Sequence, residues 1–97
     1  MKYYHVSICK NRESIQRLGV DPIFSQGKNR ASWWCDQTAL DWAVLHVMRK
    51  YKVFRLEIDV WVLHRTMPKG AIPYRAKPGV YYTRCANKPD YLINVIP

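Results

Sequence analysis

A histidine near the amino terminus is the first residue whose chemistry stands out. Tyr4, Val6 and Ile8 alternate with their neighbours, and this period of two predicts a short strand. The same period places His5 and Ser7 together on the opposite face. An imidazole both donates and accepts hydrogen bonds near neutral pH, so His5 is a candidate for binding a ligand. A strand histidine whose hydrogen bonds are satisfied by its neighbours is the structural alternative.

A polar loop is the second candidate. Residues 24–30 read FSQGKNR, with one glycine among polar side chains, and this composition is typical of a loop. Lys28 and Arg30 supply cations that suit a pyrophosphate or a nucleic-acid backbone, and a solvated basic loop is the alternative. The members of this loop with predicted ligand-binding roles are Ser25, Gln26, Gly27 and Arg30.

Aromatic side chains make up 13% of the chain, more than so small a core requires, so we expect some of them at a binding surface. Trp33 and Trp34 lie in a strand predicted over 31–34, and Tyr82 lies in a later apolar run. Such rings stack on planar groups, with a contribution of about 1 to 3 kcal/mol per base. Core packing of one of the tryptophans is the alternative.

Lysine and arginine outnumber the acidic residues by 16 to 7, which gives a formal net charge of +9. This charge favours polyanionic partners or phosphate-bearing ligands and does not choose between them. The sequence has no nucleotide-binding glycine fingerprint, Walker motif, paired zinc ligands or Gly-x-Ser-x-Gly elbow. It therefore predicts no metal site, and several large enzyme classes lose support.

At 97 residues the chain has the size of one small domain, so we expect a single domain over 1–97. No apolar run approaches the ~20 residues needed to span a bilayer, and the amino terminus lacks the apolar core of a signal peptide. The three cysteines are an odd number without close pairing, which indicates reduced thiols. We expect a soluble, cytoplasmic protein.

The elements that position these residues follow from periodicity and capping. Asn11 predicts the start of a short helix and Gly19 its end. Asp36 is predicted to cap a second, longer amphipathic helix. The apolar residues of segment 54–60 alternate with charged ones, which predicts a half-buried strand, and 61–67 is expected to be irregular. Further strands are predicted over 31–34, 79–83 and 91–96, so the fold class is α+β, with mixed, mostly antiparallel strands and two helices.

In this order and spacing, the segments are similar to the ADP-ribosyltransferase superfamily, and the chain most resembles the catalytic domain of the RNA 2′-phosphotransferases. The resemblance covers nearly all of the chain. Its most specific parts are His5 on the first strand and the Gly79-Val80 pair. The segments that carry it are Tyr4-His5, Leu18-Gly19-Val20, Trp34-Cys35-Asp36, the strand 54–60, Tyr74 to Thr83 and Lys88-Pro89-Asp90-Tyr91-Leu92-Ile93.

The resemblance implies a small ADP-ribosyltransferase-like fold and an enzyme that transfers ADP-ribose from NAD to a phosphate, nucleic-acid or protein acceptor. In the phosphotransferase version, an RNA 2′-phosphate attacks the ribose anomeric carbon and nicotinamide leaves. Arg75 would face the acceptor phosphate, which a guanidinium binds through two parallel hydrogen bonds, and a solvated loop arginine is the alternative. His5 would bind a ribose hydroxyl. The predicted catalytic residues are His5 and Arg75, and the predicted NAD-binding residues are His5, Ser7, Ser25, Gln26, Gly27, Arg30, Trp34 and Tyr82.

Departures from the family pattern leave a second hypothesis open. The phosphotransferases have an arginine before the first-strand histidine, where this chain has Tyr4, and a second-strand histidine, where it has a tryptophan. Protein-modifying members use a late glutamate, and the segment 79–83 has none. The alternative is a non-enzymatic basic protein that reuses the fold to bind nucleic acid or to inhibit a nucleic-acid enzyme. A third reading is a domain with a protein partner, whose positive charge only aids solubility.

Overall fold

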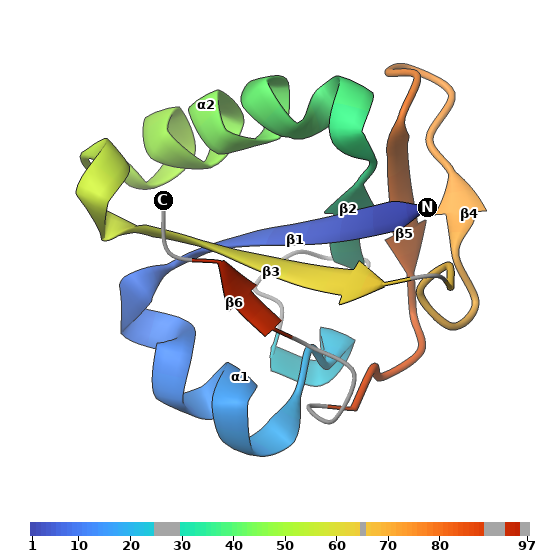
Figure 1. Cartoon of the computed structure of the whole chain (residues 1–97), viewed down its shortest axis with the longest axis horizontal. Coiled ribbons are helices and arrows are strands. Elements are labelled where there is room, and N and C mark those ends of the chain that lie inside the picture. Colours follow the sequence, from blue (N-terminus) through green and yellow to red (C-terminus); the bar gives the residue numbers. More distant parts are fainter. Residues whose placement is uncertain (25–29, 65, 89–92, 96–97) are drawn as a thin grey trace.

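The computed structural model describes residues 1–24, 30–64, 66–88 and 93–95. Within them, one sheet has the strand order β4-β5-β2-β1-β3-β6, and two helices pack on it (Figure 1). This confirms the α+β class with two helices, and each pairing in the sheet is antiparallel. The elements are β1 (Lys2–Ile8), α1 (Arg12–Leu18), β2 (Ser32–Cys35), α2 (Leu40–Tyr51), β3 (Ile58–His64), β4 (Ile72–Pro73), β5 (Val80–Thr83) and β6 (Ile93–Val95), with 3-10 turns at Cys9–Asn11, Pro22–Phe24, Gln37–Ala39 and Arg55–Glu57.

The sheet consists of two halves that meet at a short seam. β1 pairs with β3 along its whole length, from Lys2 to Ile8. With β2, in contrast, it pairs at one position, Tyr4 opposite Cys35. Figure 1 shows β1 and β3 running across the view, while β2 and β5 run steeply to them. The halves β4-β5-β2 and β1-β3-β6 therefore diverge beyond this pair, and we call the junction between β1 and β2 the seam.

The two faces of the sheet have separate cores because successive strand residues point to opposite sides. α2 covers one face, where its apolar stripe meets Tyr4 and Val60, and α1 lies on the other (Figure 1). The α2 core is formed by Tyr4, Cys35, Ala39, Val44, Ile58, Val60, Val62 and Val80. The other core is formed by Tyr3, Ile15, Val20, Trp34, Trp61 and Leu63.

An ion pair fastens the start of α1 to β3. The Arg12 guanidinium donates from Nε to Asp59 Oδ2 at 2.9 Å and from Nη2 to Oδ1 at 2.8 Å. Asp59 is buried, and its hydrogen bonds and charge raise the pKa of Arg12. Asp59 pairs across the sheet with Ser7. This contact fixes α1 beside the end of β1 that carries Ser7.

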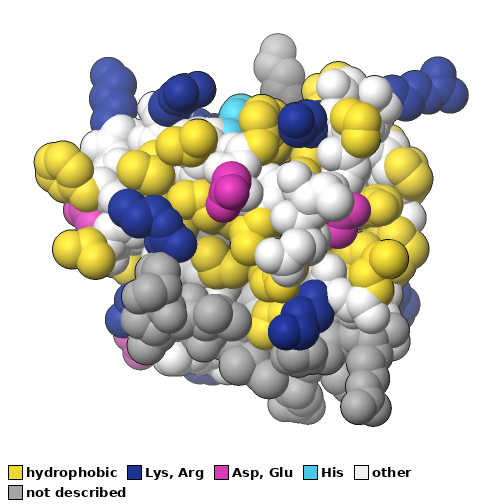
Figure 2. All heavy atoms as spheres, turned by 45° about the horizontal axis from the view of Figure 1, so that its top comes forward, with side chains coloured by type: hydrophobic (Ala, Val, Ile, Leu, Met, Phe, Trp, Pro, Cys, Tyr) yellow, Lys and Arg dark blue, Asp and Glu magenta, His cyan; other side chains and the backbone are white. Residues whose placement is uncertain are grey.

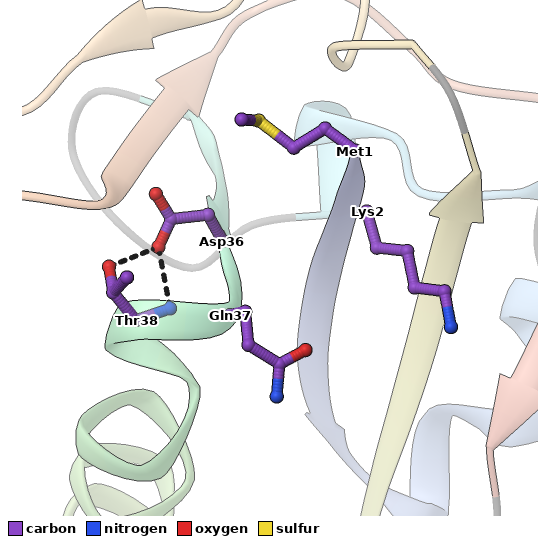
Figure 3. Close-up of a pocket in the computed structure, with 5 residues that line it drawn as sticks. All are labelled: Met1, Lys2, Asp36, Gln37 and Thr38. Carbon is purple, nitrogen blue, oxygen red and sulfur yellow. Dashed lines mark hydrogen bonds between the residues drawn. The ribbon is translucent and has the colours of Figure 1, made fainter.

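The start of α2 is packed against β5 through a glycine. Asp36 Oδ1 accepts from the Thr38 backbone N–H at 2.9 Å, and the Asp36 N–H donates to the Gly79 carbonyl at 2.9 Å. Gly79 has a φ of +82°, and a Cβ there would lie 2.6 Å from Asp36 Oδ1. Asp36 and Thr38 also border a small hollow of about 200 Å³, in which their side chains point toward each other (Figure 3). The glycine of the Gly79-Val80 pair is thus explained by a close approach of backbone and side chain.

The predicted strand over 54–60 is wrong at its start. Residues Arg55–Glu57 form a 3-10 turn, and the side chains of Phe54 and Leu56 are 80% and 88% exposed. The Glu57 carboxylate accepts from the Phe54 N–H at 2.6 Å, and the Glu57 N–H donates to the Phe54 carbonyl at 2.9 Å, which closes the turn. β3 begins at Ile58 and continues through most of the segment expected to be irregular. Residues 58–63 are buried in succession because this stretch of β3 lies between two strands and is covered on both faces.

The other predicted elements are confirmed with small shifts. The first helix ends at Gly19, whose φ is +77° and whose N–H donates to the Ile15 carbonyl at 2.8 Å. Asn11 lies at its start, but no side-chain capping hydrogen bond forms there. Asp36 caps the 3-10 turn that precedes α2. β6 falls within the predicted strand 91–96, of which 91, 92 and 96 lie outside the described residues. Neither described helix has the length and apolar character needed to cross a membrane.

Candidate functional site

A cavity of about 810 Å³ lies at the seam between β1 and β2. Its walls come from both strands, from α1 and the turn after it, from α2, and from the turn that leads into β5. Because the strands pair only at Tyr4 and Cys35, side chains from both faces of the sheet reach this space. Its volume falls in the range of about 300–1,000 Å³ that is usual for small-molecule sites.

His5 lies in the wall formed by β1 and is half-buried. Its Nδ1 is 2.7 Å from the backbone carbonyl oxygen of Trp33, across the seam. A carbonyl oxygen only accepts, so Nδ1 carries the proton and donates, and in the neutral ring Nε2 is an acceptor. Burial lowers the pKa of His5 below its ordinary value of 6.5, and the hydrogen bond to Trp33 opposes this less strongly. His5 is therefore a neutral imidazole at neutral pH.

The α1 side of the cavity is polar. Ser7 is buried, and its hydroxyl accepts a hydrogen bond from the Asn11 amide at 3.1 Å. Ser14 and Asp21 also line this side, and Asp21 Oδ1 accepts from the Ile23 N–H at 3.0 Å. Asp21 is the one carboxylate in the described lining. This side offers hydroxyl and amide groups and little charge.

The α2 side of the cavity is aromatic and basic. Trp42, His46 and Lys50 line it at intervals of four residues, so they share one helix face. The rings of Trp42 and His46 stack at 5.1 Å with 18° between their planes. The Nζ of Lys77 lies 5.6 Å from the centre of the Trp42 ring, within range of a cation–π interaction. On this side of the molecule, Figure 2 shows Lys and Arg side chains among hydrophobic ones.

A second set of rings, Trp33, Tyr74 and Tyr82, is called the ring group. The Trp33 ring centre lies 5.0 Å from that of Tyr74, nearly perpendicular at 85°, and 5.5 Å from that of Tyr82. Trp33 is 47% exposed and Tyr74 38% exposed, and both line the cavity. The ring group therefore presents planar apolar surface to solvent at the cavity mouth.

The structure brings together three of the predicted NAD-binding residues. His5, Ser7 and Trp34 all line the cavity, and the rings of His5 and Trp34 lie 5.3 Å apart. Trp34 is also a core residue, 2% exposed, and its indole N–H donates to Ser32 Oγ at 3.1 Å. Both interpretations of Trp34, as a core residue and as a wall of the site, thus apply to the same side chain.

The remaining predicted residues are not in the described lining. The Tyr82 ring packs against Trp33, which is a lining residue. Arg75 is exposed, and its neighbours Tyr74 and Ala76 line the cavity. Arg30 is exposed, with a φ of +43°. Ser25, Gln26, Gly27 and Lys28 lie outside the described residues. The binding roles of these side chains stay predictions.

Sequence reasoning missed most of the α2 side. No binding role was predicted for His46, whose spacing matches no metal site, or for Trp42. The signal was the interval of four that joins Trp42, His46 and Lys50 away from the apolar stripe. The contact of Lys77 with Trp42 could not be predicted from the local sequence, because it depends on how the turn that carries Lys77 approaches α2.

Other forms of chemistry have little support in the described part of the chain. It contains no group of three or more His, Cys, Asp or Glu side chains arranged to hold a metal ion. Cys35 lines the cavity, but burial raises the pKa of its thiol to about 12, so it is a poor nucleophile at neutral pH. The cavity is therefore suited to binding and orienting a ligand.

The sequence matches no protein-family model, and neither a curated protein nor a solved structure matches this chain significantly.

Proposed function

We propose that this protein binds NAD in the cavity at the seam and transfers its ADP-ribose group to an anionic acceptor. The observation that carries the proposal is the joint placement of His5, Ser7 and Trp34 in one cavity of suitable size. The order of sequence segments that resembles the ADP-ribosyltransferases supports the same reading. NAD is a substrate in this reaction, since its bond between ribose and nicotinamide is broken.

The polar α1 side suits a ribose. The unprotonated Nε2 of His5 accepts a hydrogen bond from a sugar hydroxyl, and the hydrogen bond from Nδ1 to the Trp33 carbonyl holds the ring in place. The hydroxyl of Ser7 lies two residues along the same strand face and is oriented by Asn11. Groups fixed in this way lose little freedom when a ligand binds, and positioning is the main source of rate in such a reaction.

The remaining walls suit the charged part of the substrate. Trp34 packs behind His5 in the cavity wall, and Lys50 supplies a cation for a pyrophosphate. A phosphate-bearing ligand is also favoured by the net charge of +9.

The composition of the site favours an acceptor that is already ionised. Transfer breaks the bond between the ribose anomeric carbon and the nicotinamide nitrogen, which keeps the electron pair and leaves as neutral nicotinamide. The acceptor oxygen then forms the new bond to the same carbon. An alcohol acceptor would have to lose a proton to a base, whereas a phosphate oxygen needs none. Asp21, the one carboxylate of the described lining, already accepts a backbone hydrogen bond, and this proposal assigns Nε2 of His5 to a ribose hydroxyl, so the phosphate acceptor fits best.

Calorimetric titration of NAD into the purified protein, with nicotinamide release followed in parallel, tests this proposal. We expect binding by the wild type, and about two- to tenfold weaker affinity in His5→Ala, which loses a hydrogen bond of about 0.5–1.5 kcal/mol. Phe54→Ala is the control, since Phe54 is 80% exposed and is not among the residues that line the cavity. NAD binding that is equal in wild type and His5→Ala would contradict the assigned role of His5. Binding of nucleic acid with no NAD binding would favour the non-enzymatic alternative.

A further inference from the structure

The ring group and the segment 68–88, which contains Tyr74 and Tyr82, extend beyond the proposed NAD site. Trp33 and Tyr74 are 47% and 38% exposed, although they line the mouth of the cavity. Rings in a site that encloses a small molecule would be covered by walls on most sides. Here they are open to solvent, which suits a ligand that extends beyond the cavity.

The segment 68–88, which contains Tyr74 and Tyr82, is positively charged. From Pro68 to Lys88 the sequence contains five cations and no carboxylate. Four of the five are exposed, and the fifth, Lys77, is half-buried against Trp42. α2, on the other side of the mouth, contributes one acid, Asp41, against two cations. The five cations of the segment are Lys69, Arg75, Lys77, Arg84 and Lys88.

We propose that this surface binds single-stranded nucleic acid, with bases stacked on the ring group and phosphates on the cations of segment 68–88. Exposed rings next to cations are the combination by which proteins hold unpaired nucleotides, because every base has a π face and every linkage a negative charge. A duplex fits less well, since its bases are already stacked on one another. A protein partner is less suited to a segment that contains five cations and no carboxylate.

The same surface makes single-stranded nucleic acid the acceptor in the proposed reaction. Trp33 and Tyr74 of the ring group line the same cavity as His5, so a strand bound there would bring a terminal or internal phosphate toward the ribose. In that respect the inference rests on the proposed function. The binding of single strands itself stands independently and is measured without NAD.

Fluorescence anisotropy with a labelled 12-nucleotide strand of mixed sequence, in the absence of NAD, is the first experiment. The wild type should bind the single strand more tightly than a duplex of the same length. Trp33→Ala should weaken binding by about 5- to 150-fold, and Trp33→Phe should restore most of it. Phe54→Ala is the matched control, because Phe54 is an exposed ring outside the cavity lining, and it should bind like the wild type.

The dependence of affinity on salt concentration measures the contribution of the cations separately from that of the rings. Lys77→Ala should reduce the slope of log affinity against log salt by about one, and Lys10→Ala, at an exposed position outside the cavity lining, should leave it unchanged. Circular dichroism confirms that each variant is folded. Equal binding by Trp33→Ala, Phe54→Ala and wild type, or equal affinity for single strands and duplexes, would overturn the proposal in favour of non-specific attraction by charge.

The two proposals fail in distinguishable ways. If NAD does not bind but single strands bind through Trp33, the nucleic-acid surface is supported and the proposed transferase activity is contradicted. If NAD binds and releases nicotinamide while single strands bind no better than duplexes, the transferase stands and its acceptor is of another class.

Discussion

The two edges of β1 differ in a way that separates stability from function. On the β3 edge, each residue from Lys2 to Ile8 has a partner, and the packed cores continue across the pairing. On the β2 edge, one pair joins Tyr4 to Cys35, and beyond it the strands part. The cavity lies where hydrogen bonds between strands are missing.

This difference shows how a small chain makes room for a ligand. β1 belongs both to the fully paired half of the sheet and to the wall of the cavity. Pairing with β3 holds His5 in place, while its side chain faces the cavity at the seam. As a consequence, the half-sheet β4-β5-β2 is joined to β1 by one residue pair and depends on other contacts for its stability. One of these is the contact of Asp36 with Gly79, and another is the hydrogen bond between His5 and Trp33.

The largest expected effect compares two tryptophans on opposite sides of β1. Trp61, on the paired side opposite His5, is 2% exposed, so Trp61→Ala should lower the free energy of unfolding by about 3–5 kcal/mol. Trp33, on the open side, is 47% exposed, and Trp33→Ala should cost about 1 kcal/mol. Urea denaturation measures both. Equal losses would mean that the two edges are equally packed.

Gly79→Ala tests how the open half is supported. A non-glycine residue is strained at a φ of +82°, and the new Cβ would meet Asp36 Oδ1 at 2.6 Å and Thr38 Oγ1 at 2.7 Å. We expect a loss of about 1–3 kcal/mol in the free energy of unfolding. Thr38→Ala removes one of these contacts, so the double variant should be less destabilised than the sum of the single variants. Strict additivity would contradict the close approach.

The pH dependence of stability tests the burial of His5 at the seam. The pKa of His5 is lowered in the folded protein, so the unfolded chain takes up a proton first as the pH falls below about 6.5. The contribution of His5 is therefore fully present above pH 6.5 and is lost as the pH falls toward the folded pKa. The stability difference between wild type and His5→Gln should shrink on going from pH 7.5 to 5. Parallel stability curves for the two proteins would show that His5 is not buried as described.

The smallest effect is expected where the predicted strand proved to be a turn. Phe54→Ser and Leu56→Ser should each change the free energy of unfolding by no more than about 0.5 kcal/mol, because the side chains are 80% and 88% exposed. Val60→Ser, at a buried position of β3, is the control and should be strongly destabilising. A large loss for Phe54→Ser would restore the strand interpretation.

The sequence predicted best where a local rule governs structure. The period of two in β1, the glycine that ends α1 and the apolar stripe of α2 are each explained by neighbouring residues, and each is confirmed. The strand over 54–60 failed because alternation alone does not show which end is paired. The Glu57 carboxylate closes a turn there, while the apolar run 60–63 reflects burial on both faces.

The candidate site was predictable in part. His5 and Ser7 share a strand face, so their common place in the cavity follows from the pattern. The α2 side and the ring group depend on how α2 and the turn before β5 approach the sheet, which no local rule gives. Nor did any pattern predict that β1 and β2 pair at a single position, although this feature creates the cavity.

The measurement that tests the central claim most directly uses the four tryptophan indole N–H signals in a ¹⁵N–¹H spectrum. Trp34 lines the cavity at the seam, whereas Trp61 lies on the paired side and is absent from the lining. Each signal is assigned by a single Trp→Phe variant, and NAD is then titrated into the wild type. We predict that NAD shifts the Trp34 signal in a saturable manner and leaves the Trp61 signal in place. No shift at Trp34, or an equal shift at Trp61, would contradict the assignment of the ligand site to the open edge of β1.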